Sequence, residues 1–152
     1  MIEPYATIVN SFLDSFSKIG FSKIRESDYL VRFWDGENAV EISTEKYYHP
    51  TLITRFMDKN GRKFSIRIIR EVLAPGQLGK DSIELNAIRK HFYLDYAGID
   101  ESLRNQGIAA YVSVAIEQLL NFLSSYRKGL VAGSFKSEYA IREETALMEV
   151  GL

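Results

Sequence analysis

The chain contains no cysteine among its 152 residues. This absence excludes disulfide bonds, thiolate nucleophiles and thiolate metal ligands, and it is compatible with a reducing compartment. Histidine is nearly as scarce, since His49 and His91 are the two present. Zinc sites usually need three or four His, Cys or carboxylate ligands, so we predict neither a metal site nor any other cofactor.

An excess of charge of one sign is also absent, because the chain has 19 Lys and Arg residues and 20 Asp and Glu residues, for a net charge of -1. Such a balance identifies no partner by charge alone. No stretch approaches the roughly 18 consecutive apolar residues of a membrane helix, and Glu3 and Asp14 are atypical of a signal peptide. We therefore expect a soluble, cytoplasmic protein that does not contact a membrane.

What is present is an ordinary globular composition, with 46% apolar and 26% charged residues. The length predicts a single domain covering residues 1–152. The spacing of Ile8, Phe12, Phe16 and Ile19 predicts an N-terminal helix with one apolar face, ended by Gly20.

Strand-like alternation follows this helix. Asp35-Gly36 and Asn60-Gly61 each separate two alternating runs, which is a strong signal for hairpins. The predicted strands are residues 29–34, 39–43, 52–57 and 63–69, with a fifth at 21–25. One face of this antiparallel sheet is predicted to be apolar, and the other collects Arg32, Trp34, Glu41, Arg55, Lys63 and Arg67.

Residues 76–152 are predicted to be mostly helical. After a connector at residues 74–82, Asp81 is a candidate N-cap for a helix reaching about Tyr93. A longer helix is predicted from about Ser102 to Arg127, although Gly107 lowers helix propensity near its start. The pattern predicts an α+β fold, with four to five antiparallel strands and with the N-terminal and C-terminal helices packed on one face.

The connector sequence GQLGKDS has the strand-to-helix context of a phosphate-binding loop. The P-loop pattern, however, needs glycine and Ser or Thr where this chain has Ala74 and Asp81. The chain also has no Gly-x-Ser-x-Gly elbow. A Ser-His-Asp site assembled in space stays open at this point, but we predict no catalytic residues and no enzymatic activity.

The segment EKYYHPTL, which joins the two predicted hairpins, is the best candidate for a binding surface. Its aromatic residues beside a histidine are of the types that dominate interface hot spots, and an aromatic corner closing the sheet is the alternative. We predict that the partner-binding residues are Trp34, Glu45, Tyr47, Tyr48, His49 and Arg55.

The predicted N-terminal helix is followed by Gly20-Phe21, by YLVRFWDGENAVEISTEKYYHPTLITRFM as paired strands, by RKFSIRII, and by helices ending in YRKGLVAGSF. This order of elements resembles that of small bacterial immunity-type proteins of polymorphic or contact-dependent toxin systems. The resemblance implies a non-catalytic cytoplasmic protein that binds and neutralises a cognate toxin domain. It implies no particular interface residue, because interface residues vary in such families.

Two other functions stay open from the sequence. The basic residues and Trp34 on the predicted polar sheet face suit a nucleic-acid-binding or regulatory module. Glu41 on the same face and the nearly neutral chain argue against nucleic acid. The long apolar helix also suits a scaffold subunit that forms a homodimer.

Overall fold

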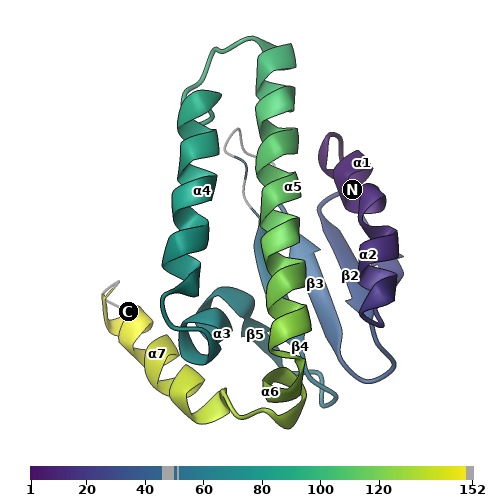
Figure 1. The fold of residues 1–152 in the computed structure, drawn as a ribbon, viewed down its shortest axis with the longest axis vertical. Helices are drawn as coiled ribbons and strands as arrows, with labels where there is room; N and C mark the ends of the chain where they lie inside the picture. The colour runs from purple at the N-terminus through teal and green to yellow at the C-terminus, as the bar shows by residue number, and fades with distance from the viewer. Residues whose placement is uncertain (46–49, 51, 150–152) are drawn as a thin grey trace.

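The structure is a computed structural model that describes residues 1–45, 50 and 52–149. Its base is an antiparallel sheet in which the strands follow one another in the order β1-β2-β3-β4-β5. The strands are β1 Ser22–Glu26, β2 Leu30–Trp34, β3 Ala39–Ser43, β4 Ile53–Met57 and β5 Lys63–Ser65. The N-terminal and C-terminal helices pack on one face of this sheet (Figure 1), which confirms the predicted α+β class.

The turn between β2 and β3 is closed by the side chain of Asp35. Its carboxylate accepts the backbone N–H groups of Glu37 and Asn38 at 2.9 and 2.7 Å, and Gly36 adopts a φ of +99° that glycine tolerates without steric cost. Arg127 of the C-terminal half donates to the same carboxylate at 2.5 Å. Burial raises the pKa of Asp35, but these donors outweigh burial, so the net pKa is lowered.

The turn between β4 and β5 uses Asp58 in the same way. Oδ1 of Asp58 accepts the backbone N–H groups of Asn60 and Arg62, each at 3.0 Å. Nζ of Lys136 lies 2.9 Å from the other carboxylate oxygen, Oδ2. Both hairpin tips are therefore joined to the C-terminal helices by an ion pair.

The predicted N-terminal helix is divided into α1 (Tyr5–Ser11) and α2 (Leu13–Lys18), with Phe12 between them. Phe16 from the predicted apolar stripe is fully buried. Its ring stacks on Phe33 of β2, with the two ring centroids 3.9 Å apart. This contact fixes α2 against the inner face of the sheet.

The last predicted strand is too long. It ends at Ser65, and helix α3 (Ile66–Leu73) begins at the next residue. Ile66 and Ile69, three positions apart, are both buried, as the helical repeat requires. The final predicted sheet positions, including Arg67, therefore belong to this helix and not to the polar face of the sheet.

In the described part of the chain, the C-terminal half forms four helices, α4 Gln77–His91, α5 Glu101–Ser125, α6 Arg127–Ala132 and α7 Lys136–Glu149. Asp100 caps α5 by accepting the backbone N–H of Leu103 at 3.0 Å. Helix α4 begins earlier than predicted. Asp81 therefore lies inside the helix, where its carboxylate pairs with Arg70 of α3 and caps nothing.

Helix α5 is the central helix of the core. It lies over the sheet and beside α4 (Figure 1), and it also packs against α1. Its buried residues Val112, Ile116 and Leu119 belong to the same apolar cluster as Val31 and Val40 of the strands. By its length and mean hydropathy, α5 is also long and apolar enough to span a membrane. The sequence did not predict this, because α5 contains no long run of consecutive apolar residues. Core packing accounts for much of its apolar surface.

Candidate functional site

The sheet face that points away from the helices is built by alternate strand residues. Because side chains alternate along a strand, Phe33 enters the core while Arg32 and Trp34 point outwards. Strand pairing aligns the outward residues in two rows, which together we call the outer face: Arg25, Arg32, Glu41, Arg55 and Ser65 in one, and Ser22, Trp34, Ala39, Met57 and Lys63 in the other.

Glu41 lies at the centre of the outer face and is nevertheless only 1% exposed. Oε2 of its carboxylate accepts Nε and Nη2 of Arg32 at 2.9 and 2.6 Å, and Nζ of Lys63 lies 2.9 Å from Oε1. Burial raises the pKa of Glu41, but Lys63 and Arg32 outweigh burial and the net pKa is lowered. The charged carboxylate of Glu41 on β3 thus holds Arg32 of β2 and Lys63 of β5 in fixed positions.

Trp34 ends β2 and is 45% exposed, an unusual position for the single tryptophan of the chain. It stands next to Ala39 in its row, so a small side chain separates the indole from Met57. An exposed indole on a strand, which is a rigid element, can bury its area against a partner at little entropic cost.

The two rows carry an excess of positive charge. Arg25, Arg32, Arg55 and Lys63 lie in them, and Glu41 is their acidic member. Arg25 and Arg55 are exposed, and the side chain of Lys63 keeps 43% of its surface exposed although it contacts Glu41. The outer face is therefore cationic, in a chain whose net charge is close to zero.

The predicted partner-binding residues do not form one cluster in the described structure. Trp34 and Arg55 share the outer face, in neighbouring rows. Trp34 pairs with Ala39, the first residue of β3. Glu45 is exposed and follows Ser43, the last residue of the same strand. At about 3.3 Å per residue, the six steps from position 39 to position 45 span about 20 Å, so Glu45 lies far from Trp34.

Tyr47, Tyr48 and His49 lie outside the described residues. The proline that follows them is buried, and its carbonyl oxygen accepts Nη2 of Arg89 at 2.8 Å. This hydrogen bond joins Pro50 to the last turns of α4. The sequence prediction of partner-binding residues left out Arg32 and Lys63, although their alternation with core residues had placed them on the polar face.

A metal-binding cluster is not formed by the described residues. Within residues 1–45, 50 and 52–149, no group of three or more His, Asp or Glu side chains is arranged to hold a metal ion. His91 is exposed at the end of α4, where its ring contacts that of Phe92 at 4.8 Å.

Comparisons of the chain with protein-family models, with curated proteins and with solved structures found no match.

Proposed function

We propose that this protein is a non-catalytic binding module that holds a protein partner on the outer face of its sheet. The observation that carries the proposal is a half-exposed tryptophan beside a cationic row whose central carboxylate is buried. Trp and Arg are the residue types most enriched among interface hot spots. Here they stand on paired strands, so little conformational entropy is lost when a partner binds.

The charge of the outer face favours a partner with an acidic surface. Arg32 and Lys63 are held in place by Glu41, while Arg55 stands opposite Glu41 in the strand register. Complementary charge accelerates encounter and selects among partners more than it adds affinity. An acidic partner surface would meet this row directly.

The size of the outer face indicates that loops also contribute. Five strands about 4.8 Å apart give a face about 19 Å wide, whereas a standard interface buries about 800 Å² on each partner. Loops at the ends of the strands have to supply the remaining area. Glu45 is exposed at one of these ends and suits a charged rim.

In its most specific form, the proposal is that the chain is an immunity protein that neutralises a cognate bacterial toxin domain in the cytoplasm. Its support is the resemblance in the order of elements, together with a sheet face that none of the described helices covers (Figure 1). Such a protein acts by covering an active site or blocking substrate access, and needs no catalytic group of its own.

The test is co-purification with the C-terminal toxin domain of a large secreted protein encoded next to this chain. We expect Trp34→Ala and Arg55→Glu each to weaken binding of that domain at least about tenfold, because both remove anchors from the outer face. Tyr96→Ala and Lys80→Glu are matched controls that change an exposed aromatic residue and a basic residue on other surfaces. The controls should bind like the wild type.

If Trp34→Ala and Arg55→Glu bind the toxin domain as tightly as the wild type does, the interface does not lie on the outer face. Failure of the wild-type chain to bind that domain would remove the immunity role. It would leave the more general proposal to be tested with other acidic proteins.

The second candidate is a nucleic-acid-binding or regulatory module. The observation in its favour is the same cationic face with an exposed indole, on which a base could stack. Binding of a random single-stranded oligonucleotide that weakens steeply with salt and is lost in Trp34→Ala would favour this candidate over a protein partner. Dimerisation through the long helix has less support, because the apolar residues of α5 pack in the core of the monomer.

A further inference from the structure

Strand β1 stands at one end of the strand order and pairs with β2 alone among the described strands. All five of its residues are exposed. The edge at the other end of the sheet is occupied, because the backbone N–H of Ser65 on β5 donates to the hydroxyl of Tyr139 at 2.8 Å and α3 begins at the next residue. The open edge of the sheet is therefore that of β1, where unpaired backbone groups can accept another strand.

Two like charges lie next to each other at this edge. Arg25 of β1 is directly opposite Arg32 of β2 in the strand register, an arrangement that destabilises a sheet. Glu41 neutralises Arg32. Arg25 is exposed and makes no hydrogen bond or ion pair with the described residues. A carboxylate on the open side of Arg25 would neutralise this second guanidinium.

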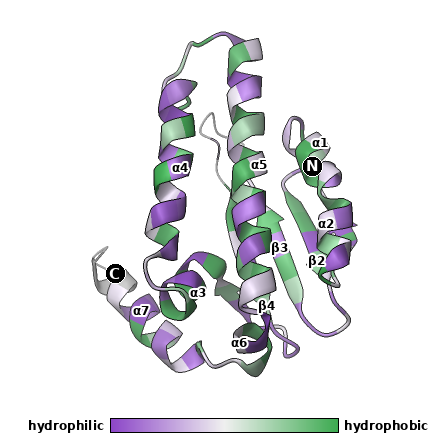
Figure 2. Ribbon diagram, viewed as in Figure 1, coloured by the Kyte–Doolittle hydropathy of each residue, from purple (hydrophilic) through white to green (hydrophobic). Residues whose placement is uncertain are grey.

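The other charged residues of β1 already have partners on the helical side of the sheet. Nζ of Lys23 lies 3.2 Å from Oδ1 of Asn10 and 3.3 Å from Oε1 of Glu26, and Oε2 of Glu26 lies 3.2 Å from the N-terminal amine. Figure 2 shows hydrophilic residues on α2, the helix that packs against β1. The surroundings of the edge are thus polar, and Arg25 is the charge of β1 that remains for a partner.

A strand added at this edge would continue the two rows of the outer face. Ser22 lies between the open edge and Trp34 in one row, and Arg25 ends the other row. Strands lie about 4.8 Å apart, so an added strand would lie about 10 Å from β2. Because Ser22 is small, an aromatic side chain of that strand can reach over it to the indole of Trp34, which is 45% exposed.

Charge argues against a second copy of the chain at this edge. If two β1 strands paired in an antiparallel manner about Ile24, Lys23 of each strand would lie opposite Arg25 of the other, and like charges in this position repel. The ladder of β1 also has a bulge between Lys23 and Arg25. Bulges and positive charge are devices by which edge strands avoid self-association. An acidic strand meets no such repulsion.

We propose that the partner of the outer face places an extended acidic segment beside β1 as a sixth strand. A carboxylate of this segment lies beside Arg25, and an aromatic side chain beside Ser22 contacts Trp34. The inference rests on the proposed function, because it specifies which part of the partner the outer face holds. Main-chain hydrogen bonds provide the affinity of an added strand, and the side-chain rows provide its specificity.

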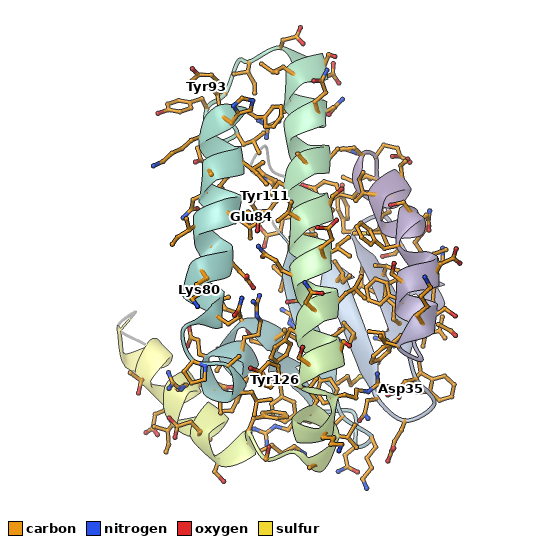
Figure 3. The ribbon with its side chains drawn as sticks, viewed as in Figure 1. Asp35, Lys80, Glu84, Tyr93, Tyr111 and Tyr126 are labelled. Atoms are coloured by element: carbon orange, nitrogen blue, oxygen red, sulfur yellow. The ribbon has the colours of Figure 1, made fainter. Side chains whose placement is uncertain are left out.

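The synthetic peptide STETYTES tests this proposal, because its Glu and Tyr side chains point to one face of a strand. We expect saturable binding to the full chain in isothermal titration, and slower hydrogen exchange of the β1 backbone amides in the complex. The lysine peptide STKTYTKS should bind at least about tenfold more weakly, and so should STETYTES to folded Arg25→Glu. Lys80→Glu is the control, since Figure 3 shows Lys80 on α4, on the other side of α5 from α2.

Two N-methylated forms of STETYTES distinguish strand addition from charge attraction. One form is methylated at its Glu and Tyr residues, and the other at the Thr residues between them. Alternate N–H groups of a strand point to opposite edges, so only one of these two sets faces β1. One methylated form should therefore bind at least about tenfold more weakly than the parent peptide, while the other keeps its affinity.

The proposal is overturned if STETYTES does not bind, if the two methylated forms bind equally well, or if folded Arg25→Glu binds as tightly as the wild type. A free chain that is dimeric, with β1 amides already protected, would assign the edge to a second copy and would also overturn it. Loss of toxin-domain binding in Trp34→Ala does not depend on these results. The proposed function can therefore hold when the sixth strand is disproved.

Discussion

Gly107→Ala is expected to lower the free energy of unfolding by about 1–3 kcal/mol, although alanine is the better helix former. Gly107 is buried in α5, where a Cβ would lie 2.6 Å from Cβ of Phe92 and 2.8 Å from Cδ2 of Leu94. Both neighbours belong to the segment that ends α4 and leads towards α5. The added methyl group would therefore push the segment after α4 away from α5.

Gly79 is a matched control for this substitution. It also lies within a helix, α4, but a Cβ there would meet nothing within 4 Å. Gly79→Ala should raise the free energy of unfolding by about 0.5–1 kcal/mol, since only helix propensity changes. Urea denaturation followed by circular dichroism measures both values. An equal gain in stability from the two substitutions would show that Phe92 and Leu94 are not in close contact with α5 at Gly107.

Glu41→Gln is expected to lower the free energy of unfolding by about 2–3 kcal/mol. The substitution keeps the shape of the side chain but leaves Arg32 and Lys63 close together without their shared carboxylate. This loss of stability is smaller than the cost of breaking a fully buried ion pair, because the side chains of Arg32 and Lys63 both retain some exposure to water. Glu37→Gln in the exposed turn beside β3 is the control, with an expected change within about 0.5 kcal/mol.

The same carboxylate predicts a dependence of stability on acid. The pKa of Glu41 in the folded chain lies below its ordinary value of 4.5. Its contribution to stability is therefore complete above pH 4.5 and is lost as the pH falls through the lower, folded-state pKa. Denaturation at a series of acidic pH values should show a smaller loss of stability in Glu41→Gln than in the wild type. Equal losses would mean that Asp35 and Asp58, whose pKa values are also lowered, carry the effect.

The strands and their turns could be predicted from sequence because their signals are local. The strand prediction at residues 39–43 is confirmed residue for residue, and the Asp-Gly and Asn-Gly turns lie where they were expected. The boundary of the last strand was missed because alternation and the helical repeat agree over a few residues. Only the position of Ile69, one turn beyond Ile66, separates the two patterns.

The candidate sites were harder to predict because they depend on packing between distant segments. Trp34 and Arg55 were assigned to one face correctly, since pleating alone determines that. The ion pair between Arg70 and Asp81 could not be predicted, since it joins α3 to α4 and no local pattern encodes the distance between these helices.

Fluorescence of Trp34, the single tryptophan, reports directly on whether the outer face is open and cationic. Because Arg32, Arg55 and Lys63 concentrate anions near the indole, the ratio of iodide quenching to caesium quenching should be larger for Trp34 than for free N-acetyltryptophanamide. Arg55→Glu should reduce that ratio. Trp34 emission that neither ion quenches would mean that the face is covered, and a ratio no larger than that of the free tryptophan derivative would mean that the face is not cationic.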